Sequence, residues 1–316
     1  MHAKFKRIKI MEFKNDYTIE EKKQVTSIGP EGSGCDIEIP KAVTHLTDKC
    51  FASFLWLKEV KLPNTIESIG DQAFIHSGLK TIELPSSIKK IGNAAFCNCK
   101  SLKEINLPDS IIEIDNDAFN GCTSLKEIII PDSVIKLGEE TFGCCSALEK
   151  VKLSNNIKNI GYNVFAWCES LKDIVIPDSV KSIHKLAFNN CHSLKSINIP
   201  DSVEYIGPNA FINCISLEKI ELPNSLENIG WCVFDGCNNL KTVKIKSKCE
   251  IPPNIFTDCN KLEKIYIEKD LPDFSPDFVK EYKDKIEIIK TKTLDDLLAE
   301  GKSLREISNI YKEKER

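Results

Sequence analysis

A repeat of 23 residues is the feature of this sequence that most constrains its fold. Nine copies of the repeat lie between residues 39 and 245, and five prolines fall on one 23-residue grid. These prolines are Pro108, Pro131, Pro177, Pro200 and Pro223. A period of this length, with apolar residues at fixed positions, is typical of a stacked solenoid. The sequence therefore predicts a repeat solenoid of about ten coils, and not a globular domain built around a pocket.

One repeat position is occupied by phenylalanine in all nine copies. A tenth, eroded copy carries Phe256 one place early. Two further positions carry only isoleucine, leucine or valine, so three columns form the predicted core. Burial in a continuous core is the physical constraint that explains such strict columns. The phenylalanines are Phe51, Phe74, Phe96, Phe119, Phe142, Phe165, Phe188, Phe211 and Phe234.

The segment that closes each repeat has the pattern of a short strand. Residues 102–107 alternate apolar and polar side chains, as a strand with one buried face does. One strand per coil, stacked at about 4.8 Å, would form a parallel sheet along the solenoid. The proline that follows ends the strand because it has no N–H to donate. The stretch after it, Ala-Phe-x-x-Cys, has room for about one helical turn.

Both ends of the chain depart from the repeat, as terminal coils do. We interpret residues 1–39 as a degenerate coil that caps the N-terminal end, and residues 40–267 as the repeat solenoid. Residues 268–290 are the predicted C-terminal cap, in which a helix begins with Ser275 as N-cap and proline at its first position. Residues 291–316 are predicted to form a helical tail.

The tail contains two short amphipathic segments, residues 293–298 and 303–307, which are separated at Gly301. Residues 300–307 are similar to the opening helix of some helix-turn-helix modules, but no recognition helix follows them in the sequence. We therefore favour a terminal packing element. A partner-binding or dimerising tail is the first alternative, and DNA binding is the second.

Eight of the fourteen cysteines share one repeat position, three residues after the phenylalanine. Neighbours in such a column point the same way, whereas metal ligands must converge on one point. Parallel Cβ vectors also give poor geometry for disulfides between adjacent coils. The sequence predicts buried, unpaired thiols that act as small hydrophobic side chains. They are Cys99, Cys122, Cys145, Cys168, Cys191, Cys214, Cys237 and Cys259.

Composition and motifs argue against several classes of function. The net charge of −4, from interspersed basic and acidic residues, provides no general attraction to nucleic acid. No apolar run approaches the roughly 20 residues that a membrane-spanning helix needs. The five histidines occupy unrelated repeat positions, and none stands in a motif beside a nucleophile. We expect no enzyme activity, no cofactor and no metal site.

The outward position of the predicted strands varies from coil to coil, as a binding surface on a fixed scaffold would. The column reads Lys61, Glu83, Asn106, Ile129, Lys152, Val175, Asn198, Glu221, Lys244 and Tyr266. Ile129 and Val175 are apolar where water is expected. We predict a partner-binding site at Ile129, Lys152 and Val175, rimmed by Asn106 and Asn198. The alternative is a merely solvated sheet.

The repeat also resembles a known family. The copy at residues 130–148 carries Ile-Pro-Asp-Ser-Val, then leucine and glycine, and later the phenylalanine, cysteine and leucine columns. This pattern is similar to the BspA-like (Treponema-type) leucine-rich repeat and covers about residues 40–267. The resemblance implies a right-handed, curved superhelix with ligand contacts on its sheet face. It implies no catalysis, and it points to microbial surface proteins that attach to host matrix or to other cells.

Two functions follow from these features. The first is a non-catalytic scaffold that binds a protein partner on the concave sheet face. The second is a BspA-like cell-surface adhesin that binds a matrix or host-cell protein.

The six cysteines outside the column show no pairing scheme, and no Asn-x-Ser/Thr acceptor occurs in the sequence. The start of the chain leads into no apolar signal core. We therefore expect a cytoplasmic protein, with the cell surface as the alternative.

Overall fold

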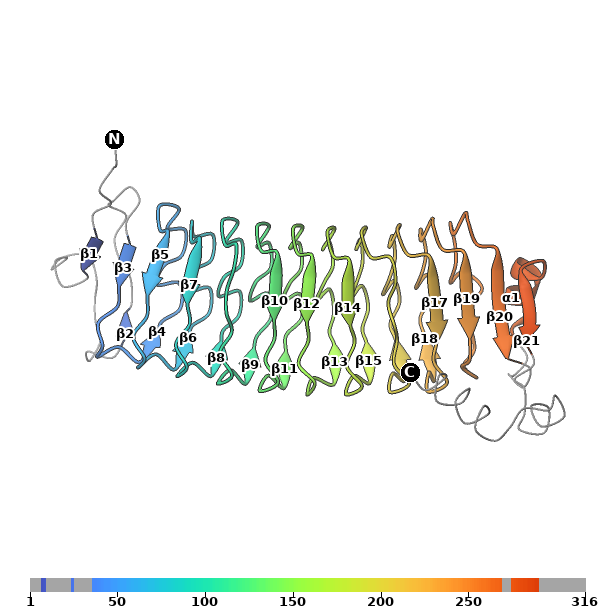
Figure 1. The fold of residues 1–316 in the computed structure, drawn as a ribbon, viewed down its shortest axis with the longest axis horizontal. Helices are drawn as coiled ribbons and strands as arrows, with labels where there is room; N and C mark the ends of the chain where they lie inside the picture. Colours follow the sequence, from blue (N-terminus) through green and yellow to red (C-terminus); the bar gives the residue numbers. More distant parts are fainter. Residues whose placement is uncertain (1–6, 10–23, 26–35, 269–273, 290–316) are drawn as a thin grey trace, which may run out of the picture.

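The computed structural model describes residues 7–9, 24–25, 36–268 and 274–289. These residues form an elongated parallel β-solenoid of about 11 turns with about 23 residues per coil, as Figure 1 shows. The predicted repeat solenoid is therefore confirmed. The helices expected in the tail, residues 291–316, lie outside the described residues, as does most of the segment before residue 36.

The predicted closing strand forms in most coils, and these strands make three parallel sheets in succession along one side of the solenoid. Neighbouring strands pair with a shift of one coil, so that Ile128 lies opposite Val151 and Val151 opposite Ile174. The strands are β1 (Arg7–Lys9), β3 (Asp36–Glu38), β5 (Glu59–Lys61), β7 (Thr81–Glu83), β10 (Glu127–Ile129), β12 (Lys150–Lys152), β14 (Asp173–Val175), β17 (Lys219–Leu222), β19 (Thr242–Ile245), β20 (Lys264–Glu268) and β21 (Ile286–Ile289). We call the outer surface of these sheets the long-strand face.

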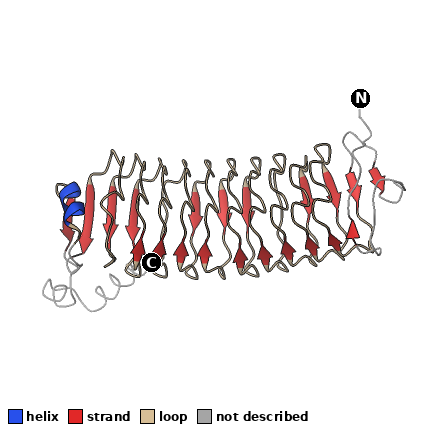
Figure 2. Cartoon of the chain, turned by 180° about the vertical axis from the view of Figure 1, so that it is seen from behind, coloured by secondary structure: helices blue, strands red, loops and turns tan. Residues whose placement is uncertain are grey.

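The structure corrects the expectation of one strand per coil, because most coils carry a second, two-residue strand. From β4 on, the second residue of each belongs to a core column, and the same stretch of the next coil is close enough to pair. Two residues are too few to show an alternating pattern in the sequence. These strands are β2 (Gln24–Val25), β4 (His45–Leu46), β6 (Ser68–Ile69), β8 (Lys90–Ile91), β9 (Glu113–Ile114), β11 (Lys136–Leu137), β13 (Asn159–Ile160), β15 (Ser182–Ile183), β16 (Tyr205–Ile206) and β18 (Asn228–Ile229). Figure 2 shows them from behind, along the lower edge of the solenoid.

The phenylalanine column is a continuous stack of rings in the interior. Ring centroids of neighbouring coils lie 5.1–5.8 Å apart from Phe51 to Phe256, and the ring planes are within 20° of parallel. Nine of the rings are fully buried and Phe256 is 3% exposed. The predicted burial of this column is confirmed, and each ring depends on both neighbours for its packing.

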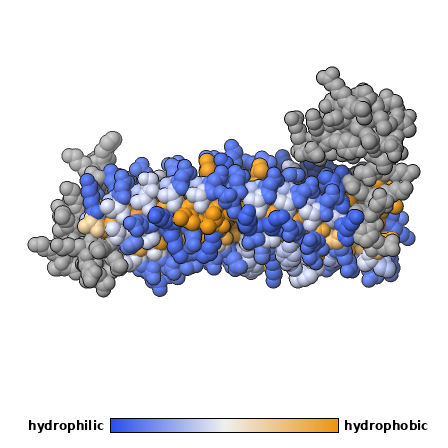
Figure 3. Space-filling model, turned by 90° about the horizontal axis from the view of Figure 1, so that it is seen from below, coloured by the Kyte–Doolittle hydropathy of each residue, from blue (hydrophilic) through white to orange (hydrophobic). Residues whose placement is uncertain are grey.

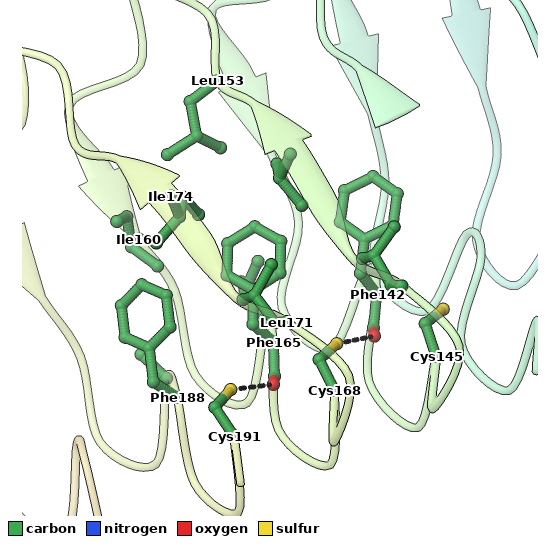
Figure 4. Packing of buried hydrophobic residues seen from close by; sticks show 14 of the residues in the cluster. Phe142, Cys145, Leu153, Ile160, Phe165, Cys168, Leu171, Ile174, Phe188 and Cys191 are labelled. Atoms are coloured by element: carbon green, nitrogen blue, oxygen red, sulfur yellow. Dashed lines mark hydrogen bonds between the residues drawn. The ribbon is translucent and has the colours of Figure 1, made fainter. Parts of the chain in front are cut away.

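The eight cysteines of the repeat are buried beside this stack, as predicted. Each Sγ donates to the carbonyl oxygen of the phenylalanine one coil earlier, at 3.0–3.3 Å. Figure 4 shows two of these bonds, from Cys168 to Phe142 and from Cys191 to Phe165. Burial raises the pKa of these thiols, to about 12 for Cys99. They therefore remain protonated at neutral pH and keep their hydrogen bonds.

The turns around the phenylalanine contain left-handed residues. Seventeen described non-glycine residues have positive φ, among them Trp167 at 63° and Leu186 at 60°. They occupy two repeat positions: the second residue before the phenylalanine and the second residue after it. The Ala-Phe-x-x-Cys stretch is therefore a turn and not the expected helical turn. Left-handed backbone reverses the chain within a few residues, which a right-handed helical turn cannot do.

A helix closes the C-terminal end of the stack, as the sequence predicts. It is α1 (Pro276–Tyr282), and the Phe278 N–H donates to its N-cap, Ser275 Oγ, at 3.2 Å. Phe278 and Tyr282 are buried. The edge of the Tyr282 ring meets Phe256 with centroids 5.7 Å apart, and its hydroxyl donates to the Pro253 carbonyl at 3.0 Å. Tyr282 thus covers the last ring of the stack.

Candidate partner-binding face

The centre of the long-strand face carries Ile129, Lys152 and Val175 side by side. They are the last residues of β10, β12 and β14, and they lie opposite one another in the strand register. The preceding residues point into the core, so these three point outward. Ile129 is 57% exposed and Val175 is 78% exposed. With strands about 4.8 Å apart, the two apolar side chains stand about 10 Å apart with a lysine between them.

A second outward row, which the sequence analysis did not identify, lies two residues earlier on the same strands. It consists of Glu127, Lys150 and Asp173, which are also in register and exposed. The alternation of strand residues could have revealed this row, since residues two apart share a face. The centre of the face therefore combines an apolar–lysine–apolar row with an acid–lysine–acid row.

Asn106 and Asn198 flank this centre, one coil beyond Ile129 and one coil beyond Val175. Both lie in coils where the long-strand sheet is interrupted. Only isolated bridges form there, between Glu83 and Asn106 and between Ser196 and the strand β17. The five predicted residues therefore come from five consecutive coils, but only the central three share a continuous strand ladder.

The interruptions coincide with shallow hollows in the long-strand face. The hollow at Asn106 has a volume of about 480 Å³, and its charged lining residues are Glu59, Glu83 and Glu104 with one lysine, Lys61. The hollows open where the regular pairing of strands is lost. The sequence pattern does not predict where this pairing is interrupted. The first hollow is acidic.

The hollow at Asn198 has a volume of about 390 Å³ and the opposite balance of charge. Its charged lining residues are Lys219, Lys244 and Glu221, and Tyr266 adds an aromatic ring. Glu221 pairs with Lys244 at 4.0 Å. The long-strand face thus changes from acidic to weakly basic along the solenoid, with the apolar pair between the two hollows.

The described histidines take part in ordinary polar contacts. His45 Nδ1 lies 2.8 Å from Ser68 Oγ, and His184 Nε2 lies 3.0 Å from Ser182 Oγ. Within the described part of the chain, no three His, Cys, Asp or Glu side chains gather in a group that could hold a metal ion. The same residues include no helix that is long and apolar enough to cross a membrane.

A comparison with protein families finds one match. The model of the BspA-type leucine-rich repeat region, which spans six copies, matches residues 31–114, 67–195 and 181–292. These matches together cover residues 31–292, which include the described elements from β3 to β21. No curated protein matches the chain.

Several solved structures share the fold. A leucine-rich repeat protein from Bacteroides ovatus is 26% identical with a TM-score of 0.71, over 89% of this chain and 78% of that one. A leucine-rich repeat protein from T. pallidum is also 26% identical, with a TM-score of 0.51, over 64% of this chain and 87% of that one. One from Eubacterium ventriosum is 24% identical with a TM-score of 0.51, over 81% and 72% of the two chains. The last supports the fold alone.

Proposed function

We propose that this chain, which belongs to the BspA-type leucine-rich repeat family, is a non-catalytic scaffold that binds a protein partner on its long-strand face. The binding site comprises Ile129, Lys152 and Val175, with Asn106 and Asn198 at its rim. The observation that carries the proposal is the exposure of an apolar pair in a column that is otherwise polar until Tyr266.

Exposed apolar side chains contribute more to recognition of a partner than to stability of the fold. An exposed Ile129 or Val175 adds little to folding, because its side chain remains in water. Apolar side chains that gather on a surface mark contact sites. A small apolar centre with a polar rim is the usual anatomy of a protein interface, and such centres contain the residues with the largest binding energies.

The charges define what such a partner presents. Lys152 lies between the two apolar side chains, so a partner carboxylate at that point would meet a cation in a partly desolvated setting. Asn106 and Asn198 offer both donors and acceptors at the rim. The partner that fits is a surface with two apolar groups about 10 Å apart and an acidic group between them.

We place this function in the cytoplasm, in keeping with the cysteines that show no pairing scheme. The alternative is a cell-surface adhesin that uses the same face to bind a matrix or host-cell protein, as the family resemblance implies. Protease added to intact native cells distinguishes the two. Degradation of the chain supports the adhesin, and protection supports the intracellular scaffold.

A pull-down from native lysate tests the binding face. The test variant is Ile129→Asp/Val175→Asp, and the matched control is Leu55→Asp/Ile215→Asp, which alters two exposed apolar residues that share a different repeat position. All proteins must first show the same melting transition as wild type. We expect the test variant to lose partners that wild type and control retain, with affinity lower by about tenfold or more.

Identical partners for wild type and the test variant would refute the assignment. Attention would then move to the exposed tryptophans of the turns, Trp167 and Trp231.

A further inference from the structure

A second apolar patch lies on another side of the solenoid, next to the two-residue strands. The residue immediately before each of these strands carries a charge in most coils: Glu67, Lys89, Lys158, Lys181, Glu204 and Glu227. Two neighbouring coils have isoleucine instead. Ile112 is 42% exposed and Ile135 is 60% exposed, and the Ile135 N–H donates to the Ile112 carbonyl at 3.1 Å. We call Ile112 and Ile135 the isoleucine patch.

The view from below in Figure 3 shows an apolar area in the middle of a largely hydrophilic surface. Figure 1 places β9 and β11, the strands that follow Ile112 and Ile135, along this lower edge. The patch therefore belongs to a different side of the molecule from the long-strand face. An inference drawn from it is independent of the proposed function.

Two lysines extend the patch along the solenoid axis. Lys89 lies one coil before Ile112, whose N–H donates to the Lys89 carbonyl at 2.8 Å, and Lys158 lies one coil after Ile135. Neither lysine forms an ion pair with a described residue, whereas Lys181 in the next coil binds Glu204 at 2.6 Å. The apolar pair thus has a free cation at each end, about 14 Å apart over three coils.

The acidic groups nearest the patch are already paired. Lys90 and Lys136 hold Asp115 between them, with N–O distances of 2.8 and 3.0 Å. The same two lysines approach Glu113 at 3.7 and 3.8 Å. Four lysines therefore surround two isoleucines and two engaged carboxylates. The local surface favours a ligand that combines apolar groups with negative charge.

The spacing of the patch matches a helix that lies along the solenoid axis. Ile112 and Ile135 come from adjacent coils, about 4.8 Å apart. Side chains at i and i+3 or i+4 of a helix lie about 5–6 Å apart, so two such residues can cover the two isoleucines. An acidic group about one turn beyond them would reach one of the flanking lysines, Lys89 or Lys158.

The chain itself contains a segment of this composition. In residues 293–300, Leu294, Leu297 and Leu298 have the spacing i, i+3, i+4, and the segment also carries three acidic residues and no basic one. The acidic residues are Asp295, Asp296 and Glu300. The sequence predicts an amphipathic helix here. Its leucine face matches the isoleucine patch, and Glu300, three residues after Leu297, is placed to reach a flanking lysine.

The length of the chain determines whether this contact forms within one molecule. At least six coils, or about 29 Å, separate the coil of Ile135 from β21 at the end of the described chain. Leu294 lies five residue steps after Ile289, and these steps span at most about 18 Å when fully extended. A helix that begins at residue 293 cannot cover the patch of its own molecule.

We propose that residues 293–300 of one molecule bind the isoleucine patch of a second copy of this chain. The contact joins two different surfaces, so it either closes reciprocally into a dimer or continues into a longer assembly. In both cases the average mass in solution rises with protein concentration. Salt weakens the association in both cases, because lysines and carboxylates contribute to it.

Analytical ultracentrifugation of the full chain over a wide concentration range tests this proposal. Wild type is compared with the patch variant Ile112→Asp/Ile135→Asp, the tail variant Leu294→Asp/Leu297→Asp and the control Leu55→Asp/Ile215→Asp. We expect wild type and control to associate, and each of the other two to dissociate about tenfold more readily. Should the patch variant fold poorly, Lys89→Glu/Lys158→Glu changes the same surface without altering an apolar residue.

Mixing the two variants provides the decisive result. The patch variant retains an intact tail and the tail variant retains an intact patch, so the mixture should form a heterodimer through the one remaining pair of surfaces. Wild type that stays monomeric at every concentration, a patch variant that associates as wild type does, or a mixture that stays monomeric would each overturn the proposal.

Discussion

Adjacent residues of the same strands follow opposite rules in this solenoid. Ile128, Val151 and Ile174 point inward and are all β-branched and apolar, whereas the residues that follow them are isoleucine, lysine and valine. The inward positions must fit a core that continues through every coil, so their chemistry repeats. The outward positions contact water or a partner, so their chemistry is free to differ. Stability and recognition are therefore separated by one residue along the chain.

The largest expected effect comes from the interior. The Phe165 ring lies between Phe142 and Phe188, at 5.7 and 5.5 Å. Replacing it with alanine should reduce the free energy of unfolding by about 3–5 kcal/mol, because a cavity opens in a continuous stack. Lys152→Ala, on the outer face of the strand β12, should change it by less than about 0.5 kcal/mol. Chemical denaturation measures both, and equal midpoints for the two variants would contradict the separation.

The C-terminal end provides a second comparison. Phe278→Asp/Tyr282→Asp places two charges where buried rings cover the stack, and we expect a loss of several kcal/mol. Deletion of residues 291–316 should leave a soluble protein that unfolds cooperatively, since α1 already covers the last ring. Aggregation of the truncated chain would show that the tail is needed as the cap.

Thiol reactivity distinguishes the interior from the turns without mutation. Cys144 is exposed in a left-handed turn, and Cys145 beside it is fully buried with a pKa raised by burial to about 12. Partial burial also raises the pKa of Cys144, but its exposure should let a thiol reagent at pH 8 modify it well before the eight buried cysteines of the repeat in the native state. Rapid modification of several of the eight, or copurified zinc, would contradict their assignment as buried free thiols.

These pKa values also predict a pH dependence. A thiol has a pKa of about 8.5 in an unfolded chain, below the raised folded-state pKa of Cys99 and Cys145. The stability from the protonated thiols is fully present below about pH 8.5 and is lost as the pH rises toward 12. The melting temperature should therefore fall over this alkaline range, and Cys→Ala variants should reduce the slope.

The smallest expected effect is in a turn. Ala94 has a φ of 51°, in the left-handed region that favours glycine. Ala94→Gly should stabilise the protein by roughly 0.5–1 kcal/mol, because it relieves the left-handed strain. Ala95→Gly, at the buried neighbouring position, is the control and should destabilise it. Thermal melts of both variants measure the difference in sign.

The sequence predicted those parts of the fold that repeat. The phenylalanine stack, the buried cysteines and the helix after Ser275 each depend on a residue type that a single physical role explains. The two-residue strands escaped prediction because pairing between coils, and not their composition, creates them. The left-handed turns were not predicted either. Residues as different as Trp167 and Leu186 occupy them, and glycine occurs there only at a few places, such as Gly121.

The sequence also predicted only part of the candidate binding surfaces. The row of Ile129, Lys152 and Val175 could be identified because strand alternation determines which residues point outward. The hollows at Asn106 and Asn198 depend on where the strand ladder is interrupted, which is a property of packing between coils. The isoleucine patch required knowledge of which columns stay exposed beside the two-residue strands.

A photo-crosslinking side chain in place of Val175 tests the central claim most directly, with the same side chain in place of Ile215 as the matched control. Both positions are exposed, and they lie on different surfaces of the solenoid. After illumination of native cells, we predict a crosslinked protein partner from position 175 and none from position 215. A partner captured from position 215 but not from position 175 would contradict recognition on the long-strand face.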